Sequence, residues 1–275
     1  MTESGTHLPN NKTNNSQNPI VWRFHMLKLA LVDLDGTVYV GNKLIDGADE
    51  AIDNMRKSGM HVRFCTNNSF KSVESIAAKL RNMGIPCQPT DVISSGLMGI
   101  HYAKTHHLEK VYFCGSDQFR AEFERNFIEL ADENTCKNLV IAMDIEYDYT
   151  KMTRAVRAAL RAEKIVVCSK DKLFPCEGGL CPGCGAIVSS ILSVTGRRED
   201  TFVGKPDPYM ISYAAKECNA EPGEIIVIGD VPENDEAMAA AYGSHSLVIG
   251  RDIASLGETK TWDWHNGDPD RCFSL

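Results

Sequence analysis

The fold of this chain is decided by one stretch, Leu27-Lys28-Leu29-Ala30-Leu31-Val32-Asp33-Leu34-Asp35-Gly36-Thr37. Its first part is mostly apolar, which is typical of a buried parallel strand, and the acids and glycine that follow indicate a loop. Because residues two apart in an extended segment face the same side, Asp33 and Asp35 point together, about 6.6 Å apart along the chain. Paired acids at the end of a strand favour a cation-binding site.

The same order, a strand and then a helix, recurs along the chain. Apolar runs predict strands at 61–65, 111–114, 139–143, 165–168 and 225–229, and helical spacing predicts helices at 47–58, 72–83, 118–126, 150–163, 186–194 and 208–218. Alternation of this kind implies right-handed βαβ units. The predicted fold class is therefore α/β, with a doubly wound parallel sheet.

The middle of the chain repeats the alternation by itself, which predicts a second α/β unit at residues 104–184. The first unit then consists of two separate segments, 23–103 and 185–275. Residues 1–22 are polar and lack apolar periodicity, so the sequence predicts a disordered N-terminal tail there.

Polar residues with phosphate or metal chemistry stand at the ends of three more predicted elements. Thr66 and Asn67 follow a strand and offer a hydroxyl and amides as donors to phosphate oxygens. Lys205 stands just before a helix, where anions already bind well. Asp230 ends the apolar run 225–229, at the edge of the sheet where ligands of open α/β sheets bind, and Asp235 lies five residues further on.

A metal site is one interpretation of these acids. A hard divalent ion such as Mg²⁺ takes carboxylate and carbonyl oxygens, which suits the carboxylates of Asp33 and Asp230 and the backbone carbonyl of Asp35. Asp235 is predicted to be a further ligand or to orient the others. Taken alone, the run from Asp33 to Thr37 fits a plain turn as well, and Thr66-Asn67 fits a helix cap.

These motifs, in this order, resemble those of the haloacid dehalogenase-like (HAD) hydrolase superfamily. Within it, the chain is similar to the NagD-like, 4-nitrophenylphosphatase-type (class IIA) phosphatases, through residues 33–39, 66–69, 182–187, 195–197 and 203–206. The similarity covers about residues 28–250. It implies a Rossmann-like core and a large α/β cap inserted between the second and third motifs.

Two departures from that family concern the metal shell and the cap. Asn234 stands where members of the family usually have threonine, next to an unusual Val231-Pro232 pair. The usual Asn-Pro-Asp of the cap is replaced by Ser169-Lys170-Asp171, in which only Asp171 matches. Asp171 is therefore the candidate substrate-facing residue of the cap.

The predicted function is Mg²⁺-dependent hydrolysis of small phosphate monoesters through an aspartyl-phosphate. Asp33 is the predicted nucleophile and Asp35 the general acid and base, while Thr66, Asn67 and Lys205 bind the phosphate. Candidate substrates are a sugar phosphate, a nucleoside monophosphate, phosphoglycolate and pyridoxal phosphate. A phosphomutase or another phosphoryl transferase shares the same acids and stays open. A phosphate-binding or signalling module is a further alternative, although receiver domains are less than half as long and have no cap.

Composition limits the partners. The chain of 275 residues is 43% hydrophobic and 24% charged, with a formal net charge of −8. A negative field of this kind disfavours nucleic acid and anionic membranes, so the expected partner is a small molecule; a homodimer is left open. No apolar run approaches the length of a membrane helix or a signal peptide, which predicts a cytoplasmic protein with reduced thiols.

Four cysteines allow a rival hypothesis in the middle of the chain. Cys168, Cys176, Cys181 and Cys184 could hold zinc, or form a redox pair within Cys-Pro-Gly-Cys. Their spacing does not follow a zinc-ribbon pattern, and Pro182, Gly183 and Gly185 already belong to the family motif. Structural cysteines are the favoured interpretation.

Overall fold

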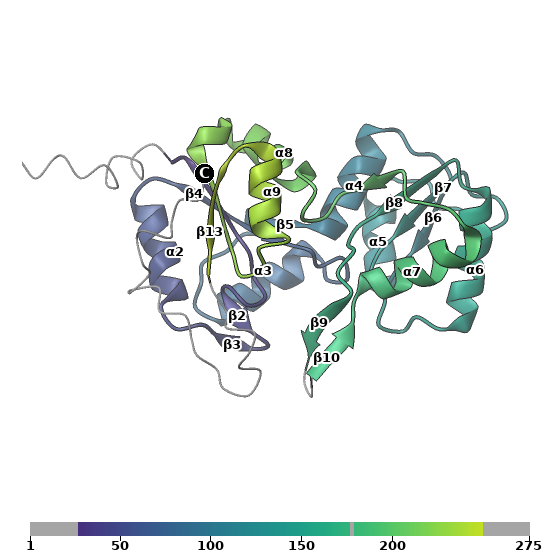
Figure 1. Ribbon diagram of the computed structural model, residues 1–275, viewed down its shortest axis with the longest axis horizontal. Helices are drawn as coiled ribbons and strands as arrows, with labels where there is room; N and C mark the ends of the chain where they lie inside the picture. Colours follow the sequence, from purple (N-terminus) through teal and green to yellow (C-terminus); the bar gives the residue numbers. More distant parts are fainter. Residues whose placement is uncertain (1–26, 177–178, 250–275) are drawn as a thin grey trace, which may run out of the picture.

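The computed structural model describes residues 27–176 and 179–249, so the tail predicted at 1–22 lies outside the described residues. Figure 1 shows two lobes side by side, each built around a sheet with helices. The lobe that contains the first strand is the core, and the lobe formed by the middle of the chain is the cap.

The core sheet has five parallel strands in the order β13 (His245–Val248), β12 (Ile225–Gly229), β1 (Leu29–Val32), β4 (His61–Thr66) and β5 (Val92–Ser94). Strand β1 is central and buried along its whole length, which explains its unbroken apolar run. The predicted α/β fold with a doubly wound parallel sheet is confirmed.

Helices cover both faces of the core sheet. Helices α2 (Ala48–Lys57) and α3 (Val73–Asn82) bury Ile52 and Leu80 in one hydrophobic cluster with alternate residues of β1. Helices α8 (Tyr209–Cys218) and α9 (Asp235–Tyr242) bury Met210 and Met238 with the other residues of that strand. Short elements complete the core: the hairpin β2 (Tyr39–Val40) and β3 (Lys43–Leu44), and the 3₁₀ turns η1 (Pro89–Asp91) and η2 (Pro222–Glu224).

The cap holds a second parallel sheet, in the order β11 (Thr201–Phe202), β8 (Lys164–Val167), β7 (Asn138–Ile141) and β6 (Val111–Cys114). Helices α6 (Tyr149–Arg161) and α7 (Cys184–Thr195) share one hydrophobic cluster with this sheet. Helix α5 (Asp117–Arg125) packs its Phe119 and Phe123 with Phe113 of β6 in another. A hairpin of β9 (Leu173–Cys176) and β10 (Gly179–Pro182) leaves the cap near the junction of the lobes (Figure 1).

The chain returns to the core later than the predicted boundary at residue 185. Helix α7 buries Ile187 and Ile191 in the cluster that contains Leu139 and Val167 of the cap sheet, and β11 pairs with β8. The apolar stripe of α7 therefore serves the cap, whereas the sequence assigned that helix to the core. Periodicity shows that a helix has a buried face, but it does not show which sheet covers that face.

Helix α4 (Ser95–Thr105), which the sequence analysis did not predict, connects the lobes. It begins directly after β5, with the side chain of Ser94 capping the N–H of Leu97 at 3.1 Å. Its Met98 belongs to the cluster that includes both Phe123 of the cap and Met210 of the core. Apolar packing thus continues from one lobe into the other through α4.

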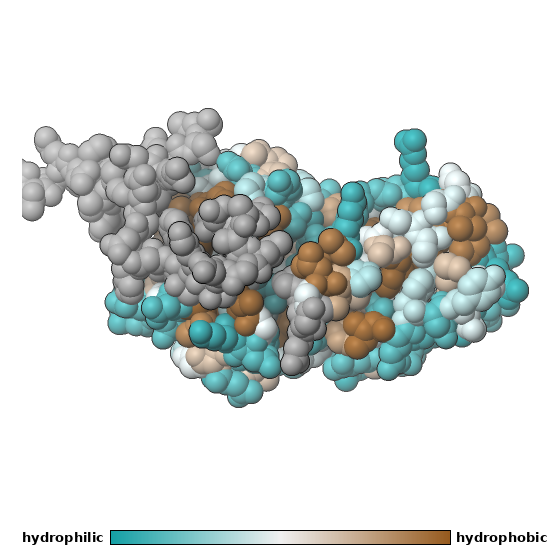
Figure 2. All heavy atoms as spheres, turned by 60° about the horizontal axis from the view of Figure 1, so that its bottom comes forward, coloured by the Kyte–Doolittle hydropathy of each residue, from teal (hydrophilic) through white to brown (hydrophobic). Residues whose placement is uncertain are grey.

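The surface of the side shown in Figure 2 is mainly hydrophilic, with apolar surface in separate patches. Exposed large apolar side chains include Leu173 and Leu180 of the β9–β10 hairpin, Tyr149 and Leu160 of α6, and Phe127. Within the described residues, no helix is long and apolar enough to cross a membrane.

Candidate active site

Three acids meet at the carboxyl edge of the core sheet. Asp33 directly follows β1 and its N–H donates to Ile228 of β12 at 2.8 Å, so the two strands end side by side. Asp230 follows β12, and Asp235 opens helix α9. One carboxylate oxygen from each of the three lies within 4.8 Å of the others. The fold therefore brings together residues about 200 positions apart, as the sequence predicted.

Gly36 makes the close packing of this site possible. Its backbone has φ +101°, which side-chain-bearing residues rarely adopt, and a Cβ atom there would lie 2.2 Å from Oδ2 of Asp230. The hydroxyl of Thr37, next in the chain, donates to Asp33 Oδ2 at 3.2 Å and to Asp230 Oδ1 at 3.4 Å. Thr37 was given no role from the sequence, because it reaches the acids through the turn at Gly36.

Lys205 is buried among these carboxylates. Its ammonium group donates to Asp33 Oδ1 at 2.5 Å and to Asp235 Oδ1 at 2.7 Å, and only 3% of its side chain is exposed. Burial alone would lower the pKa of Lys205, but the carboxylates of Asp235 and Asp33 outweigh that effect and raise the pKa well above its usual range. Lys205 is therefore a fixed cation beside Asp33.

The donor set fits a divalent cation. Three carboxylates and one ammonium group leave two negative charges in excess, and buried charge of one sign is costly unless it is matched. Burial raises the pKa of Asp235, and the Asp33 carboxylate adds to that rise against the pull of Lys205. Oxygen donors of this kind are those that Mg²⁺ prefers. Among the described residues, no other group of three metal-ligating side chains gathers as closely.

Asp35 lies beside the acids with a different environment. Asp35 is an exposed residue, but the surrounding protein partly desolvates its carboxyl group. This desolvation, together with the negative charge of Asp33, raises the pKa of Asp35. Lys79 and Lys71 act in the opposite direction. Tyr39 is hydrogen-bonded to Asp35, and the Lys79 ammonium lies 3.4 Å from the centroid of the Tyr39 ring. The sequence analysis gave Tyr39 and Lys79 no role, because Lys79 reaches the site only through the packing of α3.

Thr66 and Asn67 stand at the end of β4, next to β1. Thr66 is buried, and its Oγ1 accepts from the N–H of Asn68 at 3.2 Å, which leaves the hydroxyl hydrogen to donate. The Asn67 amide is engaged with the backbone of Lys205 and with Asp171. The cap contributes Asp171, whose Oδ1 accepts from Asn67 at 3.2 Å and from Asn234 at 3.3 Å.

The carboxyl edges of the two sheets thus face each other. Asp171 follows β8 of the cap and bonds to residues at the core edge, and the N–H of Met143, after β7, donates to Ser69 Oγ at 2.9 Å. Loops of the cap therefore lie close to the core edge that carries Asp33.

The cysteines of the cap are not alike. Cys168 and Cys184 are free and buried, and burial raises the pKa of each thiol. Cys181 is disulfide-bonded, so the prediction of reduced thiols throughout is wrong for this residue. Cys181 lies on the hairpin strand β10 and is partly open to solvent, whereas Cys168 and Cys184 are buried. No group of three metal-ligating side chains in the described part of the chain includes a cysteine, and the side chain of Cys176 lies outside it.

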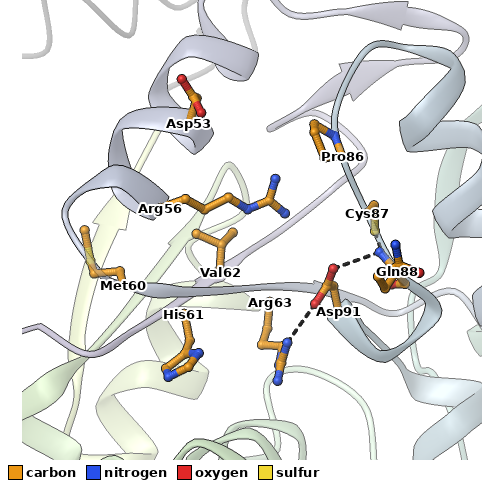
Figure 3. A pocket seen from close by; sticks show the side chains of 10 residues that line it. All are labelled: Asp53, Arg56, Met60, His61, Val62, Arg63, Pro86, Cys87, Gln88 and Asp91. Atoms are coloured by element: carbon orange, nitrogen blue, oxygen red, sulfur yellow. Dashed lines mark hydrogen bonds and ion pairs between the residues drawn. The ribbon is translucent and has the colours of Figure 1, made fainter.

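A separate hollow of about 380 Å³ lies at the opposite edge of the core sheet (Figure 3). It is lined by residues at the start of β4 and around α2 and η1, among them Arg56, His61, Arg63 and Asp91. Arg63 is paired with Asp91 at 2.8 Å, and Arg56 extends across the hollow from α2. This hollow is at the amino ends of the strands, whereas the acids and Lys205 are at the carboxyl ends.

Buried carboxylates and a lysine at the carboxyl edge of a doubly wound sheet, under an α/β cap, define a hydrolase of the phosphoryl-transfer class. Residues 30–128 match the family described as haloacid dehalogenase-like hydrolase, and residues 202–271 match a HAD-hydrolase-like family. An acid sugar phosphatase of Staphylococcus saprophyticus is 31% identical over 209 residues, which cover 76% of this chain and 80% of that protein. The chain belongs to the haloacid dehalogenase-like hydrolases, and within them to the NagD and 4-nitrophenylphosphatase type of phosphatase.

Solved structures agree with this assignment. A double mutant of a thermostable NPPase from Geobacillus stearothermophilus is 29% identical, with a TM-score of 0.75 over 81% of this chain and 88% of that one. A p-nitrophenyl phosphatase from Archaeoglobus fulgidus is 25% identical, with a TM-score of 0.77 over 81% and 85%. NagD from Escherichia coli, at 19% identity and a TM-score of 0.74, shares the fold over 81% of this chain and 87% of its own.

Proposed function

We propose that this chain is a Mg²⁺-dependent phosphatase of small phosphate monoesters that works through an aspartyl-phosphate on Asp33. One observation carries the proposal above all: Asp33 pairs with a buried, charged Lys205 and lies in one cluster with the carboxylate of Asp230, at an edge that Asp171 of the cap contacts through Asn67. Hydrolysis of phosphate monoesters is very slow in water, and catalysis depends on fixed cations around the transferring group.

The carboxylates of Asp33, Asp230 and Asp235, with the backbone carbonyl of Asp35, would hold the metal ion. When bound, Mg²⁺ supplies positive charge that offsets the negative charge of the ester and of the acids. The role of Asp235 includes positioning, since its two oxygens accept from Lys205 at 2.7 Å and from the N–H of Val231 at 3.2 Å.

Asp33 is the proposed nucleophile. An oxygen of its carboxylate forms a bond to phosphorus while the bond from phosphorus to the ester oxygen breaks. Lys205 offsets the repulsion between the two anions, and the hydroxyl of Thr37 helps to fix the carboxylate. Water then attacks the phosphorus and releases inorganic phosphate, which regenerates Asp33.

Asp35 is the proposed general acid and base. A raised pKa keeps a larger fraction of its carboxyl group protonated than in an ordinary aspartate, so it can give a proton to the leaving alkoxide. In the second step, the resulting carboxylate takes a proton from the attacking water. The hydrogen bond to Tyr39 orients the group.

Phosphate oxygens would be bound by the free hydroxyl hydrogen of Thr66 and by the loop at Asn67, with Lys205 nearby. The facing edge of the cap limits the substrate to a small molecule. Because a relative with 31% identity is named an acid sugar phosphatase and solved neighbours are nitrophenyl phosphatases, a sugar phosphate is the first candidate substrate. Nucleoside monophosphates, phosphoglycolate and pyridoxal phosphate follow.

The test is phosphate release by the purified full chain from 4-nitrophenyl phosphate and from a panel of these four metabolite classes. We expect release with Mg²⁺ and loss of activity in excess EDTA that returns when Mg²⁺ is added. Asp53→Asn removes a surface carboxylate paired with Lys57 and should behave like the wild type. Equal activity with and without the metal would contradict the proposal, as would formation of an isomeric phosphate ester without release.

A further inference from the structure

Both amide hydrogens of the Asn67 side chain are donated to other groups of the protein. Its Oδ1 accepts from the backbone N–H of Lys205 at 2.7 Å, and its Nδ2 donates to the backbone carbonyl of Lys205 at 3.0 Å and to Asp171 Oδ1 at 3.2 Å. The orientation of the amide is fixed, because a backbone N–H only donates and a carbonyl only accepts. An amide carries two donor hydrogens, so none remains for a phosphate oxygen.

This pairing holds Lys205 by both polar groups of its backbone. The neighbouring segment is packed just as closely, since a Cβ atom on Gly204 would lie 2.8 Å from Asn67 Oδ1 and 2.3 Å from the carbonyl of Cys168 in the cap. Two hydrogen bonds to Asn67 therefore fix the backbone of Lys205. From this position its ammonium group contacts Asp33 and Asp235.

The carboxylate of Asp171 completes the arrangement from the cap. One of its oxygens accepts from Asn67, which directly follows β4, at 3.2 Å and from Asn234, which directly precedes α9, at 3.3 Å. Asp171 is itself held at its backbone, where its carbonyl accepts from the N–H of Gly185 at 2.8 Å and its N–H donates to Ser169 Oγ at 3.2 Å.

We infer that Asp171 and Asn67 are positioning residues for Lys205: the cap carboxylate orients the Asn67 amide, and that amide fixes the backbone of the lysine beside the nucleophile. Asn234 gives Asp171 its second anchor on the core. Contact of the cap with the core, through Asp171, then also fixes the position of the Lys205 ammonium group. This inference rests on the proposed function of the site, and it gives Asp171 a role other than substrate contact.

Kinetics separates positioning from substrate contact. Misplacing Lys205 should slow the chemical step, with a loss in kcat on the order of 100-fold for Asn67→Ala and 10-fold for Asp171→Ala, at nearly unchanged KM. The factor for Asp171→Ala should be the same for 4-nitrophenyl phosphate and a sugar phosphate. If Asp171→Ala raises KM for only one of the two, Asp171 contacts the substrate and the inference is overturned.

A double variant tests the order of action. Because Asp171 acts through Asn67, adding Asp171→Ala to Asn67→Ala should cause no further loss in kcat beyond about twofold. If the loss in kcat of the double variant equals the product of the two single losses, Asp171 and Asn67 act independently, which contradicts the inference. The matched control is Glu199→Gln, which removes the charge of another carboxylate beside this segment, paired with Lys170, and should leave kcat unchanged.

Accessibility of Lys205 gives a measurement that needs no activity. Limited acylation of lysines, read by peptide mass spectrometry, should label Lys205 slowly in the wild type and in Glu199→Gln, and several-fold faster in Asn67→Ala and Asp171→Ala. Asp171→Asn keeps an oxygen acceptor and should stay closer to the wild type, which also covers the case that the alanine variant folds poorly. Equal protection of Lys205 in all variants would overturn the inference. If the wild type hydrolyses no phosphate monoester, the proposed function fails, and the labelling still decides whether Asp171 and Asn67 hold Lys205.

Discussion

At the scale of single residues, the gathering of the charged site residues could be predicted from the sequence, whereas their hydrogen bonds could not. Asp33 and Asp230 each follow an apolar strand, so their meeting at one edge follows from the parallel sheet. Lys205 was predicted as a fixed cation, and the structure places it against Asp33. The partners of Asn67 were not predictable, because Asp171 and Lys205 lie more than 100 residues away in the chain.

Lys205→Met should impair both activity and stability. The substitution leaves Asp33 and Asp235 buried without their cation, which costs about 3–5 kcal/mol when one partner of a buried ion pair is removed. We expect kcat to fall on the order of 100-fold or more. Thermal unfolding in EDTA measures the stability loss, which should shrink at acidic pH as the carboxyl group of Asp235, whose pKa is raised by burial, becomes protonated.

The control for this variant is Lys28→Met, which removes an exposed lysine paired with Glu224 at 2.9 Å. Surface pairs contribute about 0–1 kcal/mol, so its melting temperature should stay near that of the wild type. If Lys28→Met lowers the melting temperature as much as Lys205→Met does, the buried ion pairs of Lys205 do not stabilise the site more than a surface pair does.

Asp35→Asn should slow turnover and stabilise the fold at neutral pH. A carboxyl group with a raised pKa binds its proton more tightly in the folded than in the unfolded chain, so the wild type loses stability as pH rises from 3.8 through that raised pKa. An amide does not titrate and avoids this loss. Loss of proton transfer should cost about 10²–10⁴-fold in kcat.

Melting temperatures in EDTA from pH 3.5 to pH 8 check the stability part, with both proteins converging at the acidic end. A melting temperature of Asp35→Asn below that of the wild type at pH 8 would contradict the raised pKa. Kinetics with an alkyl and an aryl phosphate checks the chemistry, because a good leaving group needs the proton less and should show the smaller loss.

At the scale of elements, periodicity predicted most helices and six strands, β1, β4, β6, β7, β8 and β12, within a few residues, whereas α9, β5 and β13 were not predicted. Helix α5 illustrates why: Phe119 and Phe123 are four residues apart, and both are buried. Helix α4 was missed because apolar residues lie on most of its surface, without the alternation of an amphipathic helix. The β9–β10 hairpin was missed as well, although the sequence pair Gly178-Gly179 is a recognised turn signal.

Truncation of Phe123 tests the packing between α5 and the cap sheet. Its ring is fully buried, with its centroid 4.5 Å from that of Phe113, so Phe123→Ala should cost about 3–5 kcal/mol. Phe127 lies four residues further on and is 96% exposed, so Phe127→Ala should change stability by less than about 0.5 kcal/mol. Chemical denaturation measures the free energy of unfolding of both variants. A loss for Phe127→Ala equal to that for Phe123→Ala would contradict this packing.

At the scale of the whole molecule, the site belongs to the junction of two sheets. The sequence predicted two α/β units, but it placed α7 in the wrong one, because an apolar stripe does not identify the surface that it covers. It also did not show that the carboxyl edges face each other, which depends on contacts such as Met143 with Ser69. Under the proposed function, the core supplies the reaction, and the facing cap edge limits which phosphates reach it.

Chemical trapping of the phosphorylated enzyme tests most directly whether Asp33 carries the reaction. Enzyme quenched in acid during turnover with Mg²⁺ and substrate should carry one phosphoryl group, and borohydride reduction should convert the modified aspartate to homoserine at position 33, found by peptide mass spectrometry. Asp33→Asn should give neither the adduct nor phosphate release. Rapid turnover by the wild type without any adduct, together with activity retained in Asp33→Asn, would contradict the aspartyl-phosphate mechanism.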